Sequence, residues 1–139
     1  MVHLITGEKG KGKTRFLIDA ANANIQDAKG SVVYLDHSMR HIYELNNKIR
    51  LTNTKDYDLT NKDEVVGFIM GIISQNHDVE QLYIDGLMKL PGVDRENIEY
   101  IIEKLQGLSE KYSIDITITV SVDKADLSSE AQALVVTSL

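Results

Sequence analysis

The sequence predicts one α/β domain over residues 1–139, a three-layer α/β/α sandwich around a mostly parallel sheet of about five to six strands. Two observations favour this class. Apolar, strand-like runs alternate with amphipathic, helix-like segments along the chain, an order that is typical of parallel sheets. The 139 residues, of which 42% are hydrophobic, suffice for one domain with its own core. The chain has no cysteine, which excludes disulfides and thiolate metal sites.

The beginning of the chain is expected to form two strands and one helix. The apolar run 2–6 predicts a strand, and a glycine-rich loop follows it. From Lys13 onward, apolar residues recur on one helical face. Gly30 is the expected end of that helix, because glycine accepts the left-handed conformation that ends many helices. The continuous apolar run 31–35 is typical of a strand that is covered on both faces.

The middle of the chain carries two helix-capping patterns. Ser38 is expected to cap a short helix, and a brief edge strand should follow at 49–52. Asn61 and Glu64 resemble a capping box at the start of an apolar helix over 62–75. The expected core side of the short helix consists of Met39, Ile42 and Leu45.

The second half of the chain repeats the alternation of strand and helix. A strand is predicted at 81–85, and Asp94 is the expected cap of a helix with a clear apolar stripe over 98–108. Strict alternation of apolar residues predicts a strand over 114–122, and the run 133–137 predicts a last one.

Charge and hydropathy exclude several classes of function. With 15 Lys and Arg against 21 Asp and Glu, the formal charge is −6. That balance does not indicate a general nucleic-acid binder, whose affinity comes from cations on phosphates. The longest apolar stretch, 65–73, falls short of the about 20 residues that span a bilayer, and no secretory signal is visible at the N-terminus. A cytoplasmic protein without a membrane partner is therefore expected.

One loop carries the clearest chemical pattern, because residues 7–14 match G-x-x-x-x-G-K-[ST] in full. Its glycines allow a tight turn that brings the backbone close to a phosphate chain, and the following helix adds its positive N-terminal end. Lys13 is expected to reach the phosphates as the catalytic cation, and the Thr14 hydroxyl to bind Mg²⁺. The expected phosphate-contacting set is Gly7, Glu8, Lys9, Gly10, Lys11, Gly12, Lys13, Thr14 and Arg15.

On this loop and the order of its strands, the chain resembles the P-loop NTPase superfamily, which implies the P-loop NTPase fold with ATP and Mg²⁺ as cofactors. In that family an acidic residue after a hydrophobic strand helps to hold the magnesium, and Asp85 is the residue that matches. The resemblance is to the RecA-like branch of the family. In that branch a further strand lies between the strand before the phosphate-binding loop and the strand before the acidic residue. The resemblance implies that the 114–122 strand lies between the 2–6 strand and the 81–85 strand. The 31–35 strand is expected beyond the 81–85 strand, and the 133–137 strand on the opposite side of the 2–6 strand.

The sequence departs from that branch at Gly86, where a water-activating glutamate often follows the aspartate. The departure puts efficient hydrolysis in doubt, because a carboxylate normally orients the attacking water. Asp36 is the first substitute candidate for a catalytic base, and Glu8 is the second. Asp123 ends the 114–122 strand, where the family often places a polar residue that senses the γ-phosphate, and Ser121 is the neighbouring candidate.

Other polar residues have both a functional and a structural interpretation. Arg40 and Arg95 could reach a phosphate in a neighbouring subunit as arginine fingers, or face solvent. His37 and His41 have the spacing of two metal ligands on one helical face, although no third ligand is clustered with them. The segment 123–127 is similar to the guanine-reading motif of GTPases, but the D-x-x-G pattern expected at Asp85 is missing.

Three functions remain open at this point. The leading hypothesis is a weak or partner-dependent ATPase that binds Mg-ATP and whose site is completed by an unknown protein partner or a second copy of the chain. The second is a small-molecule phosphotransferase with Asp36 as base, although no arginine-rich lid segment is visible. The third is a non-hydrolysing interaction protein that binds nucleotide. A GTPase is the weakest alternative, and no sequence pattern reads the base.

Overall fold

All six strands of the sheet run parallel in the computed structural model, which describes residues 1–139. The order across the sheet is β3-β2-β4-β5-β1-β6. This confirms the predicted parallel sheet and the predicted order, in which the 114–122 strand separates the first strand from the 81–85 strand. The strands are β1 (Val2–Thr6), β2 (Ser31–Asp36), β3 (Arg50–Asn53), β4 (Val79–Ile84), β5 (Asp115–Val120) and β6 (Val135–Ser138).

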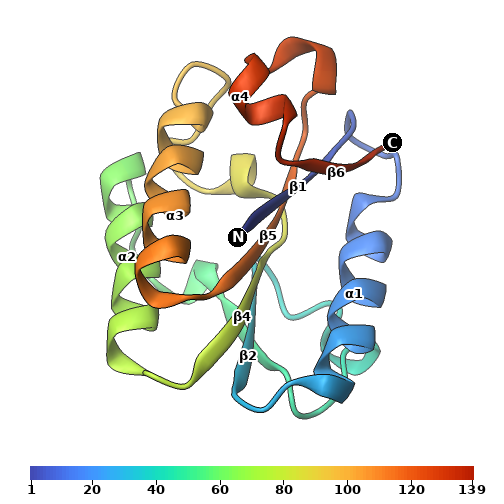
Figure 1. Ribbon diagram of the computed structural model, residues 1–139, viewed down its shortest axis with the longest axis vertical. Helices are drawn as coiled ribbons and strands as arrows, with labels where there is room; N and C mark the ends of the chain where they lie inside the picture. Colours follow the sequence, from blue (N-terminus) through green and yellow to red (C-terminus); the bar gives the residue numbers. More distant parts are fainter.

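Helices cover both faces of the sheet (Figure 1). α1 (Lys13–Asn24) packs on one face, where ten buried residues form a separate core cluster. α2 (Lys62–Gln75) and α3 (Ile98–Tyr112) pack on the other, over a cluster of 26 buried residues. The short α4 (Ser129–Gln132) precedes β6. None of these helices is long and apolar enough to cross a bilayer.

β2 shows why the strand sequences read as continuous apolar runs. Its side chains alternate between the two clusters, with Val32 and Tyr34 on the α1 side and Val33 and Leu35 on the α2–α3 side. Because both faces are covered, neither set can be polar. The prediction of a strand covered on both faces is confirmed.

The strand order brings three loops to one edge of the sheet. In a parallel sheet all carboxyl ends lie at the same edge, and β1, β5 and β4 are adjacent. The loops that follow these strands are the glycine-rich loop, the segment after Val120, and the segment that begins with Asp85. Ligands of open α/β sheets bind at this edge.

The predicted short helix after Ser38 is wrong. The structure has only a 3-10 turn at Ile42–Glu44, and of the expected core side only Leu45 is buried. Asn22 of α1 explains the difference. Its side chain donates to the Glu44 carbonyl (2.8 Å) and accepts from the Asn46 amide (2.8 Å), so side-chain contacts replace helical backbone bonds in this segment.

Two predicted helix boundaries are also wrong, whereas a third is confirmed. α1 ends at Asn24, and Gly30 is not left-handed; a Cβ there would lie 2.2 Å from the Asp78 carbonyl oxygen, so glycine permits a close backbone approach. Asp94 caps a turn before α3, accepting from the amides of Glu96 and Asn97. The Asn61 cap is confirmed, since its side chain accepts from the Glu64 amide at 2.9 Å.

Candidate functional site

The glycine-rich loop turns the chain sharply from β1 into α1. Gly10 and Gly12 have φ values of +87° and +92°, which side-chain-bearing residues rarely adopt. Gly12 is the residue directly before α1, so its left-handed backbone sets the direction in which the helix begins. Gly7 also has a positive φ, and a Cβ there would lie 3.0 Å from the Leu139 carbonyl oxygen. The loop therefore requires glycine at all three positions.

A polar pocket of about 140 Å³ lies between this loop and residues at the carboxyl ends of β4 and β5. None of its lining residues is hydrophobic. Three lysines face one carboxylate, so the pocket carries excess positive charge although the whole chain is acidic. Such a pocket favours an anion. Its lining consists of Lys9, Gly10, Gly12, Lys13, Thr14, Asp85, Gly86, Lys89, Thr119 and Ser121.

Lys13 is the buried cation of the pocket, with 8% of its surface exposed. Its ammonium group donates to the Glu8 carbonyl oxygen at 3.1 Å. Burial lowers the pKa of Lys13 most, and the nearby Lys89 lowers it further, while Asp85 and Glu8 act in the opposite direction. Burial therefore disfavours the charged form of Lys13, and a bound anion would offset this cost.

Thr14 and Asp85 form the central contact of the site. The Thr14 hydroxyl donates to the Asp85 carboxylate at 3.1 Å across 71 positions of sequence. Asp85 is 6% exposed and directly follows β4, so the sheet and α1 together bring the pair to the pocket. A hydroxyl and a carboxylate are oxygen ligands of the kind that Mg²⁺ prefers beside phosphate. This donor set fits a magnesium ion.

Two further hydroxyls orient the Asp85 carboxylate. The buried Tyr34 hydroxyl donates to it at 3.0 Å, and the Thr119 hydroxyl donates at 3.3 Å while accepting from the Gly86 amide at 2.6 Å. Burial and the Asp85 charge raise the pKa of Tyr34, so its phenol stays a donor. Neither residue is predictable from the sequence, because each has the pattern of an ordinary member of a buried strand.

Four of the predicted loop residues do not line the pocket. Gly7 contributes backbone geometry, and Lys11 is exposed. The Glu8 carboxylate turns away and lies 3.3 Å from the Arg95 guanidinium. Arg15 points along α1, pairing with Asp19 at 3.4 Å and with Glu44.

Asp36 also lies outside the pocket lining. It is only 2% exposed, and one carboxylate oxygen accepts from the His37 amide at 2.7 Å. Its second oxygen is buried without a hydrogen-bond partner. The His37 Nδ1 atom lies 2.9 Å from the first oxygen but has no hydrogen bond of acceptable geometry. His41 contacts Glu44 instead, so the two histidines do not form the predicted helical pair.

Arg95 lies within reach of an acidic cluster beside the loop. Ligand atoms of Glu8, Asp123 and Asp126 lie within 4.8 Å of one another. The Arg95 guanidinium is 3.3 Å from Glu8 and 3.8 Å from Asp126, and thus partly neutralises the cluster. In this chain Arg95 is paired, while Asp123 is exposed and only Ser121 of the predicted sensor pair lines the pocket.

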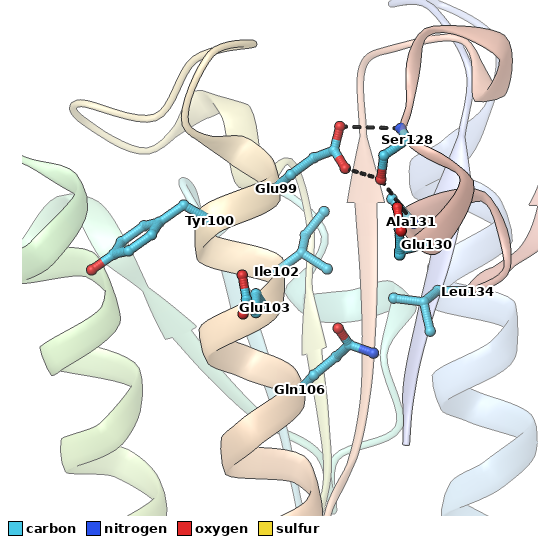
Figure 2. A pocket seen from close by; sticks show the side chains of 9 residues that line it. All are labelled: Glu99, Tyr100, Ile102, Glu103, Gln106, Ser128, Glu130, Ala131 and Leu134. Atoms are coloured by element: carbon cyan, nitrogen blue, oxygen red, sulfur yellow. Dashed lines mark hydrogen bonds between the residues drawn. The ribbon is translucent and has the colours of Figure 1, made fainter.

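The largest pocket of the molecule lies elsewhere, between α3 and the α4–β6 segment (Figure 2). It measures about 530 Å³, and three glutamates but no lysine or arginine line it. One of them, Glu99, bonds the amide and hydroxyl of Ser128. An acidic wall of this kind repels phosphate, so size alone does not mark the anion site.

Comparison with known proteins leaves the site to be judged on its geometry. No protein-family model matches the chain, and no curated protein sequence matches it.

Proposed function

We propose that the chain binds Mg-ATP in the lysine-lined pocket, as a RecA-like member of the P-loop NTPase superfamily, and hydrolyses it slowly without a partner. The observation that carries this proposal is the Thr14–Asp85 contact inside a pocket lined by three lysines. The strand order supports the branch, because β5 lies between β1 and β4.

The loop supplies the expected contacts for the phosphate chain. The start of α1, with its partial positive charge, adjoins Gly10 and Gly12. Lys13 would exchange the neutral Glu8 carbonyl for charged phosphate oxygens, and this exchange strengthens its hydrogen bonds. Its burial makes that exchange favourable, since the ammonium group has lost water on folding.

Thr14 and Asp85 would hold the magnesium ion, which supplies charge neutralisation to the phosphates when bound. Tyr34 and Thr119 keep the Asp85 carboxylate facing Thr14, so the ligand oxygens are arranged before the ion arrives.

Slow hydrolysis follows from the arrangement of the carboxylates. Asp85 is the one carboxylate that lines the pocket, and it is committed to the magnesium side. Glu8 is paired with Arg95, and Asp36 is buried outside the lining. No carboxylate is therefore free to orient an attacking water. A protein partner or a second copy of the chain would supply that group.

A phosphotransferase is the second candidate, because one Asp36 oxygen has no hydrogen-bond partner. This function requires Asp36, which is buried outside the pocket lining, to become accessible when a substrate binds. A buried carboxylate with a free oxygen can accept a proton from a substrate hydroxyl. Incubation with ATP and a panel of nucleosides and small alcohols tests this function. Transfer that Asp36→Asn abolishes would support it, whereas release of ADP and phosphate alone would reject it.

Calorimetric titration with Mg-ATP and Mg-GTP tests the leading proposal. We expect Lys13→Ala to weaken triphosphate binding about tenfold to hundredfold, the effect of losing one charge-assisted hydrogen bond or two. Lys11→Ala is the matched control, because Lys11 lies in the same loop but does not line the pocket. Equal affinity in wild type and Lys13→Ala would reject the proposal.

A further inference from the structure

Lys89 is a pocket residue that lies outside the glycine-rich loop. It ends the 3-10 turn Leu87–Lys89, which follows Asp85 and Gly86 directly. Its amide donates to the Gly86 carbonyl at 2.9 Å and closes the turn. The side chain lines the pocket together with Lys9 and Lys13. A cation from the β4 side thus faces the same space as the cations of the loop.

Gly86 makes room for this lysine. A Cβ at Gly86 would lie 2.8 Å from Cδ of Lys89 and 3.2 Å from its Cγ and Cε, so the lysine stem crosses directly over the glycine. The φ value of +74° at Gly86 is also one that favours glycine. The residue that replaces the family's glutamate therefore has a positive role, because it lets Lys89 fold back over the pocket.

The charge of Lys89 has no partner in the folded chain. No carboxylate lies within ion-pair distance of its ammonium group. The ammonium is close enough to Lys13 to lower the pKa of that residue. Two neighbouring cations with a single carboxylate in the same pocket are stabilised by a multivalent anion between them.

We infer that Lys89 binds the terminal phosphate of the nucleotide and makes the site selective for triphosphates over diphosphates. The inference rests on the proposed function. It follows from the position of Lys89 four residues after Asp85, on the magnesium side of the pocket. Thr14 and Asp85 would hold a magnesium ion that neutralises the terminal phosphates, so the Lys89 ammonium on the same side of the pocket would meet the γ-phosphate. Lys9 and Lys13 approach from the loop instead.

Titration of wild type and Lys89→Met with Mg-ATP and Mg-ADP tests the inference. Methionine keeps most of the apolar stem over Gly86 and removes the charge. We expect Lys89→Met to bind Mg-ATP about tenfold more weakly and Mg-ADP within about twofold of wild type. Lys11→Met serves as the charge-matched control and should change neither. Unchanged ATP affinity, or equal losses for ATP and ADP, would overturn the role of Lys89.

Gly86 provides a second, independent variant. Gly86→Ala should displace the lysine stem and lower the ATP-to-ADP preference as much as Lys89→Ala does. The double variant Gly86→Ala/Lys89→Ala should show the same preference as Lys89→Ala alone. Additive losses would contradict the inference.

The nucleotide site and the role of Lys89 can be rejected separately. Mg-ATP binding that does not depend on Lys13 would reject the nucleotide site. Binding that depends on Lys13, with the ATP-to-ADP preference unchanged in Lys89→Met, would reject only the role of Lys89.

Discussion

The Thr14 hydroxyl and the Asp85 carboxylate lie 3.1 Å apart, although 71 positions separate them in the sequence. Neither residue has a strong meaning alone, because threonines begin many helices and aspartates follow many strands. Their contact depends on the sheet order, which places the loop after β1 and the end of β4 on either side of β5. The contact converts two separate patterns into one candidate magnesium site.

Loss of the Thr14 hydroxyl should remove most of the magnesium dependence of nucleotide binding. Thr14→Val keeps the shape of the side chain but removes one oxygen ligand, and we expect magnesium to strengthen ATP binding about tenfold less than in wild type. The measurement is ATP affinity with magnesium and with a chelator. Thr117→Val on β5 is the control, since Thr117 does not line the pocket. The same magnesium effect in all three proteins would contradict this role.

Tyr34→Phe should destabilise the fold by about 1–3 kcal/mol, because it takes one donor from the buried Asp85 carboxylate. Urea unfolding measures the effect. Tyr83→Phe is the matched control: Tyr83 is also buried on a central strand, but its hydroxyl bonds Asn24 and Gln81 at the edge of the core. A smaller loss in Tyr34→Phe than in Tyr83→Phe would show that Asp85 does not depend on Tyr34.

Lys13→Met should raise stability at neutral pH while it weakens nucleotide binding. The pKa of Lys13 is lowered in the folded state, so the unfolded chain holds this proton to higher pH than the folded chain does. Between the folded pKa and 10.5, the stability of wild type therefore rises with pH, and the advantage of the variant should shrink. Urea unfolding of both proteins at pH 7 and near pH 10 tests the sign. A variant advantage that grows with pH would contradict the assignment.

Two glycines with different backbone conformations should respond oppositely to substitution by alanine. Gly12→Ala forces a side chain into φ +92° and should cost about 1 kcal/mol or more of stability together with nucleotide affinity. Gly67 lies inside α2, where a Cβ meets no atom within 4 Å, so Gly67→Ala should stabilise by about 0.5–1 kcal/mol. Thermal unfolding compares them. Stabilisation by Gly12→Ala would mean that the loop is not held in this conformation.

The parts of the fold that follow from local pattern could be predicted from the sequence. The strict alternation in β5 and the apolar run in β2 identify strands because burial of one or both faces leaves no alternative. Local pattern gives the wrong structure for the 38–45 segment. Its apolar residues have helical spacing, but Met39 and Ile42 are exposed, so the packing that would stabilise a helix is missing. Asn22, a residue of another element, decides its conformation.

The candidate site also contains residues that a sequence pattern predicts and residues that only the fold brings together. Five of the nine expected loop residues line the pocket, and they could be named because their spacing repeats a known pattern. Lys89, Tyr34 and Thr119 could not. The sheet order and the turn at Gly86 bring Lys89 and Thr119 to the pocket and Tyr34 to the Asp85 carboxylate. The one available signal is Gly86, because a glycine directly after a strand-end aspartate indicates a sharp turn. Lys89 lies three residues further on, close enough for such a turn to bring it to the pocket.

A crystal structure with Mg²⁺ and a non-hydrolysable ATP analogue tests the central claim most directly. We expect the phosphates in the pocket between the glycine-rich loop and Asp85, within hydrogen-bond distance of the Lys13 ammonium. Magnesium should contact the Thr14 hydroxyl and Asp85 directly or through water. A nucleotide bound elsewhere, or a magnesium ion held without Thr14 and Asp85, would contradict the account.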